Sequence, residues 1–442
     1  MDRRAMLYAF LLAALCFPIG ASADGDHHDR HHHHANPATV AARQKFFGTQ
    51  NVDRHTGRVN PDKVIFSWIT NASFAAAVNG HVMLLDTYVT RLEVAPGRTP
   101  FVIQDLLDLQ PEALFIGHGH FDHADNAAYI SAKTGAPIYA TPETCDNMAI
   151  DATNNFSHGY TAVSTVTCIP LTGRGSIPGS EIVHVNQFEP DISIKVFKHL
   201  HSTNTGVTDP DAVPVAATSG GVCQPTASKG NTFPCNLQDP RDPLLFPAGT
   251  LLEPATLNIA TSRQGAGGPI SLFYVFTVRG DHHGDSDDHG FRFVWHNSTG
   301  DIIDSCALPN NNSSGVPYEP GQDVHGCFPG VTVNGKTVGD NLASIMASLA
   351  PVDVEIGSVV SLGYAQNGER DIISYIQQVQ PTVFIPCHTT AVAVEGSSLE
   401  WKDGFYEALV ARGVPQEEWP QVQWLVDPND YARPLVFDLK GF

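Results

Sequence analysis

The chain has little positive charge. Lys and Arg total 25 against 46 Asp and Glu, a formal net charge of -21. Such a field repels phosphate backbones, which argues against nucleic-acid binding through a basic face. After residue 23 the chain has no apolar run as long as a membrane helix, no internal repeat and no GxSxG string. These absences argue against an integral membrane segment in the mature chain, a solenoid and a serine nucleophile elbow.

The first 23 residues have the features of a signal peptide. Arg3 and Arg4 are basic, residues 5–20 are apolar but too short to span a bilayer comfortably, and residues 21–23 (ASA) form a small-x-small cleavage site. We therefore expect an exported protein, periplasmic or secreted, whose mature chain starts at Asp24. An uncleaved anchor is the alternative.

Residues 24–37 (DGDHHDRHHHHANP) contain six of the 21 His and have no apolar period. This composition predicts a disordered segment, which is either a tail without a role or a loose zinc-collecting arm. Hydrophobic residues make up 42% of the whole chain, which is enough for a large core in the part that follows this segment. We expect one catalytic domain over residues 38–442.

Strands and helices alternate on both sides of a loop-rich middle, which predicts a single α/β domain. A Gly/Pro/Ser/Thr/Asn-rich stretch at about 203–270 predicts a long loop insertion rather than a separate core. Asn79-Gly80 is typical of a hairpin turn. The expected strands cover residues 63–69, 74–87, 113–118, 137–141, 192–200, 291–296, 352–360 and 382–388, and the expected helices 101–110, 126–134, 340–349 and 369–380.

Cysteines of an exported protein can form disulfides. Neighbours along the sequence suggest three pairs, although other connectivities are open. Cys387 is then unpaired, and we interpret it as a buried small residue rather than a metal ligand. The suggested pairs are Cys145–Cys168, Cys223–Cys235 and Cys306–Cys327.

A group of potential metal ligands directly follows the buried strand at 113–118. The string GHGHFDHADN places His118, His120, Asp122 and His123 within six residues. After a sharp turn, His118 and His120 can bind one ion, while Asp122 and His123 face a neighbouring volume that suits a second. Imidazole and carboxylate ligands suit zinc. A surface turn that is merely rich in His does not account for this spacing.

This HxHxDH string resembles the metallo-β-lactamase superfamily of hydrolases, and the resemblance covers most of residues 63–440. It implies a four-layer αβ/βα sandwich with metals at the edges of two packed sheets. It also implies that Asp86, at an early strand end, supports the metal loop and that His388, at a late strand end, is a ligand. His201 fits the third His of the first metal, and His199 is the alternative.

One ligand that the family usually has is missing from its place. The family expects an Asp that bridges both metals just after a strand in the middle-to-late chain, but here FRFVWH is followed by NSTGD. Either Asp301 reaches the site or Ser298 takes the usual place. Without that bridge a second ion is held less firmly. The resemblance therefore implies one zinc ion, or two with one weaker.

The other His have plainer interpretations. His81 reads as a surface turn residue and His296 as a strand-end residue near the pocket. The loop GDHHGDSDDHG, with His282, His283 and His289, is either a solvated turn or an auxiliary cation site.

The resemblance implies hydrolysis by metal-activated water, with Asp122 orienting the water, accepting its proton or holding the second ion. The late strand layout resembles lactonase-type and phosphodiesterase-type members. We expect a small-molecule ester or lactone first, a phosphodiester (including a lipid phosphodiester) second and a β-lactam third. An exported, non-catalytic zinc-binding protein is the alternative of another class. The sequence does not determine the oligomeric state.

Overall fold

Two seven-stranded sheets form the centre of the protein. The computed structural model describes residues 35–89, 101–119, 121–124, 126–156, 166–174, 176–200, 270–278, 290–300, 302, 332–359, 370–388, 395–425 and 430–439. Those from Ala35 onward belong to one compact unit. The predicted signal peptide and most of the insertion at 203–270 lie outside the described residues, so both stay predictions.

The first sheet contains the N-terminal strands and closes with the last strand of the chain. Its order is β14-β1-β2-β3-β4-β5-β6, antiparallel from β14 to β3 and parallel from β3 to β6. Asn79 and Gly80 both have positive φ, 48° and 82°, so the predicted hairpin turn is confirmed. The strands are β1 (Lys63–Thr70), β2 (Ser73–Val78), β3 (His81–Leu85), β4 (Ala113–Phe115), β5 (Ile138–Ala140), β6 (Cys168–Pro170) and β14 (Pro434–Asp438).

The second sheet contains the later strands in the order β13-β12-β11-β10-β9-β8-β7. Strands β10 to β13 are parallel, and β7 to β10 are antiparallel. The strands are β7 (Val183–Val185), β8 (Ile192–Leu200), β9 (Ile270–Val278), β10 (Phe291–His296), β11 (Val352–Ser358), β12 (Pro381–Cys387) and β13 (Gln421–Val422).

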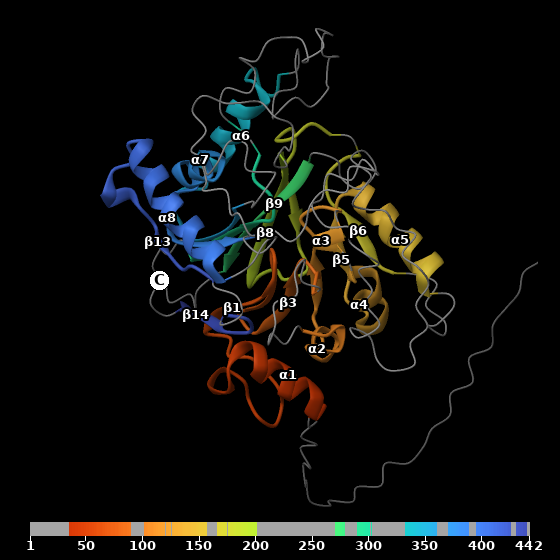
Figure 1. Cartoon of the computed structure of the whole chain (residues 1–442). Helices are drawn as coiled ribbons and strands as arrows, with labels where there is room; N and C mark the ends of the chain where they lie inside the picture. Colours follow the sequence, from red (N-terminus) through yellow and green to blue (C-terminus); the bar gives the residue numbers. More distant parts are fainter. Residues whose placement is uncertain are drawn as a thin grey trace, which may run out of the picture. The chain divides into compact units, whose positions relative to one another are not determined.

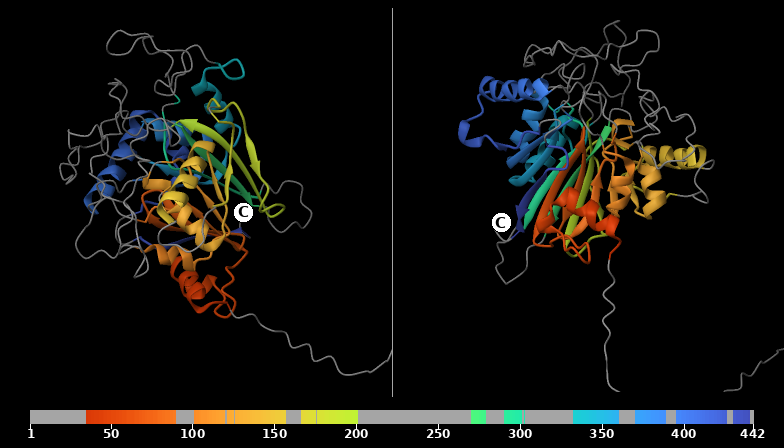
Figure 2. Two further views of the ribbon diagram at one scale, coloured as in Figure 1. Left: turned by 90° about the vertical axis from the view of Figure 1, so that its right-hand side faces the viewer. Right: turned by 60° about the horizontal axis from the view of Figure 1, so that its bottom comes forward.

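Helices cover the outer face of each sheet (Figures 1 and 2). On the first sheet they are α1 (Pro37–Phe47), α2 (Ile103–Asp108), α3 (Phe121–Ala124), α4 (Ala127–Thr134) and α5 (Pro142–Phe156). On the second sheet they are α6 (Val338–Ala347), α7 (Arg370–Val379) and α8 (Glu395–Ala411). The right panel of Figure 2 shows the sheets between the two sets of helices. The predicted four-layer αβ/βα sandwich is confirmed.

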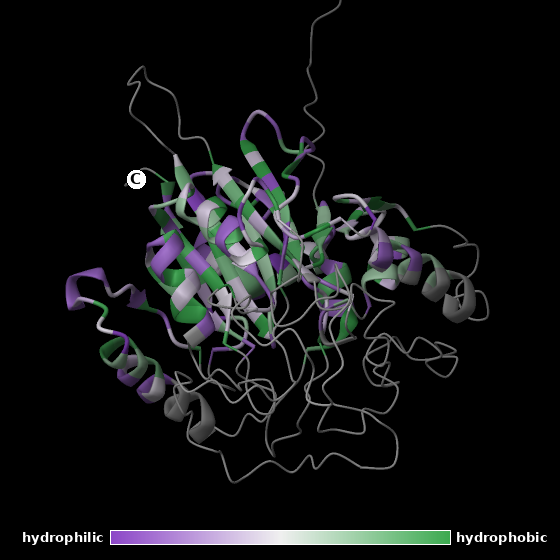
Figure 3. Cartoon of the chain, turned by 90° about the horizontal axis from the view of Figure 1, so that it is seen from above, coloured by the Kyte–Doolittle hydropathy of each residue, from purple (hydrophilic) through white to green (hydrophobic). Residues whose placement is uncertain are grey.

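Alternation along the strands explains the layering, because successive strand residues point to opposite faces. In β1, Phe66 and Trp68 pack between the sheets, whereas Ile65 and Ile69 pack under the helices. In β10, Trp295 faces the other sheet and Val294 faces α6 and α7. Both faces of each sheet are therefore apolar, and the central strands are mostly green in Figure 3.

Four of the described helices were not predicted from the sequence: α1, α3, α5 and α8. Helix α1 begins at Pro37, with Asn36 as its N-cap accepting a hydrogen bond from the Ala38 amide. Cys145 of α5 is bonded to Cys168 of β6, which confirms one predicted disulfide. The other two predicted pairs lie outside the described residues. None of the described helices is long and apolar enough to cross a membrane.

Candidate metal centre

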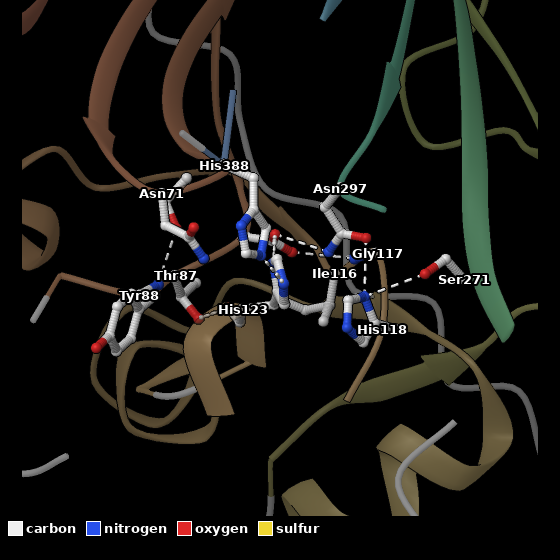
Figure 4. A network of polar contacts seen from close by, with 12 residues as sticks. Asn71, Thr87, Tyr88, Ile116, Gly117, His118, His123, Ser271, Asn297 and His388 are labelled. Atoms are coloured by element: carbon white, nitrogen blue, oxygen red, sulfur yellow. Dashed lines mark hydrogen bonds and ion pairs between the residues drawn. The ribbon is translucent and has the colours of Figure 1, made fainter. Parts of the chain in front are cut away.

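Four strands end at the same place, and each is followed by a polar residue of the candidate site. Asp86 follows β3, His118 follows β4, Asn297 follows β10 and His388 follows β12. Strands β3 and β4 are parallel neighbours in the first sheet, and β10 to β12 are parallel neighbours in the second. Figure 4 shows His118, His123, Asn297 and His388 facing one another where these ends meet.

Asp86 is the hub of this cluster. Its side chain is fully buried, and its φ of 55° turns the chain sharply after β3. One carboxylate oxygen accepts a hydrogen bond from the Gly117 amide at 3.0 Å. The other lies 2.7 Å from His123 Nδ1 and accepts a bond from Asn297 Nδ2 at 2.8 Å. The predicted supporting role of Asp86 therefore has a geometric basis: its carboxylate fixes residues from three separate segments.

His123 and His388 approach each other from the two sheets. Their Nε2 atoms are 3.2 Å apart, and their exposed fractions are 1% and 8%. The Asp86 contact occupies the far nitrogen of His123, Nδ1, so its Nε2 faces His388. His388 has a φ of 65°, and its amide donates to the Asn71 carbonyl at 3.0 Å in the β1–β2 turn. The backbone of the first sheet thus holds the His that the second sheet provides.

His118 is buried, and two polar side chains contact its Nδ1. Its Nδ1 lies 2.9 Å from Asn297 Oδ1 and 3.1 Å from Ser271 Oγ. Its ring centroid is 4.2 Å from that of His123. The structure therefore brings together three of the predicted ligands, His118, His123 and His388.

The remaining predicted ligands are described only in part. His120 and His201 lie outside the described residues, as does Asp301, and of Asp122 only the backbone, in α3, is described. Within the described part of the chain, no group of three or more His, Cys, Asp or Glu is arranged to hold one ion. A complete ligand set would therefore draw on His120, Asp122 or His201, and their assignment stays a prediction.

His199 occupies the helix-covered side of the second sheet. It is buried, and its Nδ1 lies 3.1 Å from the Tyr375 hydroxyl of α7. Its ring also packs edge-on against Phe273. The choice between His199 and His201 stays a prediction.

Asn297 was not predicted as a site residue. The expectation after β10 was a carboxylate, or Ser298 in its place, but the residue that directly follows the strand is an amide. Ser298 is buried, and its carbonyl lies 3.0 Å from His296 Nδ1. The signal was available, since the first residue after a central parallel strand commonly faces the ligand crevice.

Two further buried groups border the site. Burial raises the pKa of the Cys387 thiol well above its ordinary value, and the nearby Asp86 and Glu355 act in the same direction. A thiol held protonated is a poor metal ligand, in keeping with the interpretation of Cys387 as a small core residue. Burial also raises the pKa of Glu355, against the lowering effect of its 2.9 Å contact with His296 Nε2.

Comparisons with known proteins give similarity of two kinds. No family model matches the chain. A metal-dependent hydrolase from Pyrobaculum islandicum is 33% identical over 76 residues, which is 17% of this chain and 32% of that relative. The chain thus matches about a third of the length of that curated relative. Over this stretch the chain is similar to metal-dependent hydrolases.

Two solved structures illustrate the similarity of fold. A metallo hydrolase from Ignicoccus hospitalis is 11% identical, with 85% of this chain and 98% of that one covered and a TM-score of 0.42. A Thermotoga maritima protein assigned to the Zn-dependent hydrolases of the metallo-β-lactamase superfamily is 10% identical, with coverages of 76% and 80% and a TM-score of 0.25.

Proposed function

We propose that this protein is an exported, zinc-dependent hydrolase that acts on a small-molecule ester or lactone. The observation that supports it most is the 3.2 Å separation between the Nε2 atoms of His123 and His388. Two imidazoles bound to one tetrahedral zinc at 2.0–2.1 Å would place their nitrogens about 3.3 Å apart. Residues from opposite sheets thus already have the spacing of two ligands.

The donor set fits a zinc ion in its chemistry as well. His123 receives its Nδ1 contact from a buried carboxylate, the arrangement that commonly orients a zinc-binding imidazole. His118, His123 and His388, with the predicted His120, Asp122 and His201, would hold one or two zinc ions. When bound, zinc supplies a Lewis acid and lowers the pKa of a bound water.

Other residues of the chain would orient the metal ligands and the attacking water. Asp86 holds the His123 ring in one orientation, and the Asn71 carbonyl fixes the backbone of His388. Asp122, in the short helix α3, is proposed to orient the attacking water and accept its proton. The net charge of -21 disfavours polyanionic substrates, so a neutral carbonyl ranks above a phosphodiester.

A hydrolysis screen of the zinc-loaded full chain tests the proposal. We expect turnover of lactones or aryl esters, weaker or no turnover of phosphodiesters and β-lactams, and loss of turnover with bound zinc in H123A. Turnover that persists in H123A with wild-type zinc content would overturn the assignment. A chain that binds many weak ions, loses them on deletion of 24–37 and turns over no substrate would be a zinc-binding protein instead.

Export is tested separately by cell fractionation. We expect the mature protein outside the cytoplasm, with an N-terminus at Asp24 by mass spectrometry. Recovery of the uncut chain from the cytoplasm would contradict export and leave the hydrolase proposal standing.

A further inference from the structure

We propose that Asn297 is a positioning residue, which fixes the tautomer of His118 and the orientation of His123, and that the position after β10 provides no metal ligand. The inference rests on the proposed metal-dependent function. It concerns the place where related enzymes are expected to carry a bridging Asp. In this protein, that place is taken by an amide whose two ends contact Asp86 and His118. Figure 4 shows the amide beside His118.

The Asp86 carboxylate decides which way the Asn297 amide points. A carboxylate only accepts hydrogen bonds, so the Asn297 atom 2.8 Å from it must be the NH₂ group. The amide oxygen then faces His118 Nδ1 at 2.9 Å, and this oxygen only accepts. His118 must therefore carry its proton on Nδ1. The lone pair of the neutral imidazole is then on Nε2, the nitrogen that would bind zinc.

The same amide helps to hold His123, acting through Asp86. Asn297 Nδ2 and His123 Nδ1 contact the same carboxylate oxygen, Oδ2, while Oδ1 accepts from the Gly117 amide. Three donors thus fix the Asp86 carboxylate in one rotamer. Removing Asn297 leaves Asp86 less constrained and so loosens the ring of His123 as well as that of His118.

The backbone around Asn297 leaves the amide little freedom. His296 Nδ1 donates to the Ser298 carbonyl at 3.0 Å, and Thr299 Oγ1 donates to the Ser358 carbonyl at 2.6 Å. These bonds lock both sides of the turn. The amide also packs closely against Gly117, since a Cβ added to Gly117 would come within 2.2 Å of Asn297 Cγ. The amide is therefore wedged between the two sheets and already engaged at both ends.

An Asp at position 297 would not become a free bridging ligand. Its ionised carboxylate would stand 2.8 Å from that of Asp86 in a buried site, where like charges repel strongly. In its protonated form it would only reproduce the hydrogen bonds of Asn297. Neither form adds a metal ligand.

The first test measures the tautomer of His118 in the full chain before zinc is added. We expect ¹⁵N shifts of a protonated Nδ1 and an unprotonated Nε2 in the wild type, assigned by comparison with H118Q, and loss of this single tautomer in N297A. An Nε2-protonated His118 in the wild type would overturn the inference. This readout does not depend on hydrolysis, so it can fail while the proposed function stands.

The second test counts and titrates zinc on the full chain. We expect N297A to bind zinc about 10–100-fold more weakly, as for other residues that orient metal ligands. We expect N297D to bind as many ions as the wild type, with equal or lower affinity. The matched control is N341A, because the buried Asn341 amide donates to the Gly179 carbonyl at 2.9 Å, away from the site.

The outcomes separate clearly. Unchanged affinity in N297A, or an additional tight ion in N297D, would overturn the positioning role. Equal losses in N297A and N341A would also overturn it, since they would reflect general destabilisation. A wild-type chain that binds no zinc would refute the proposed function, and the tautomer measurement would still decide the role of Asn297.

Discussion

Replacing Gly117 by Ala is the most direct perturbation of this arrangement. The new Cβ would lie 2.2 Å from Cγ and Nδ2 of Asn297 and 2.3 Å from Oδ1, distances that real side chains do not tolerate. Gly117 cannot retreat easily, because its amide donates to Asp86 and its carbonyl accepts from the Leu272 amide at 2.7 Å. The φ of Gly117 is not positive, so backbone strain is not involved. The Asn297 amide has to move instead.

The cost follows from the contacts that the amide gives up. Its bonds to His118 and Asp86 contribute about 1 kcal/mol each, and forcing extra volume into a packed site costs about 1–3 kcal/mol. We therefore expect G117A to lower the free energy of unfolding by about 3–5 kcal/mol, and zinc affinity by about 10–100-fold. Urea denaturation and zinc competition on the full chain measure both quantities.

Two controls make the G117A result specific. In G173A the nearest atom to the new Cβ is Oε1 of Glu181 at 3.3 Å, on a side chain that can give way, so little loss is expected. In an N297A background the clash at Gly117 is removed, so G117A should cost far less there than in the wild type. Wild-type stability and zinc affinity in G117A, or full additivity with N297A, would refute the reasoning.

Three other predictions follow from the structure. D86N places an NH₂ group against groups that now donate to the Asp86 carboxylate. It should lower the free energy of unfolding by about 2–3 kcal/mol and weaken zinc binding in titrations. Unchanged values of both would contradict the central role of Asp86. Replacing Cys145 and Cys168 by Ala opens a loop with a sequence separation of 23, which should cost about 3 kcal/mol in urea denaturation, and a loss near zero would count against this. The hydrogen bond with Glu112 raises the pKa of His81 above 6.5, while bonds from His81 and Val82 outweigh burial and lower the pKa of Glu112 below 4.5. The raised pKa of His81 stabilises the fold fully below pH 6.5, and the lowered pKa of Glu112 stabilises it fully above pH 4.5. E112Q should therefore lower the free energy of unfolding most between pH 4.5 and 6.5 and less at pH 8. A loss that does not change with pH would contradict the pairing.

Much of the fold could be predicted because its signals are local. The β-branched and aromatic residues of β1 predict a strand, and Asn79-Gly80 predicts the β2–β3 turn. Neither prediction depends on any other part of the chain. The helix α5 was missed because its apolar residues are sparse and its position depends on packing and on the Cys145–Cys168 bond. Tertiary context overrides a weak local pattern.

The fold class and the group of His and Asp after β4 could be predicted from the linear sequence, because strand periodicity and motif spacing are properties of short segments. What surrounds that group depends on how the two sheets pack. The contact between His118 and Asn297 joins residues 179 positions apart in the sequence, and that between Asn297 and Asp86 joins residues 211 positions apart. No pattern in a linear sequence reports such pairs, since they form only when two sheets bring their strand ends together. The identity of the residue after β10 was visible from the start, but its role as an orienting amide required the position of the Asp86 carboxylate.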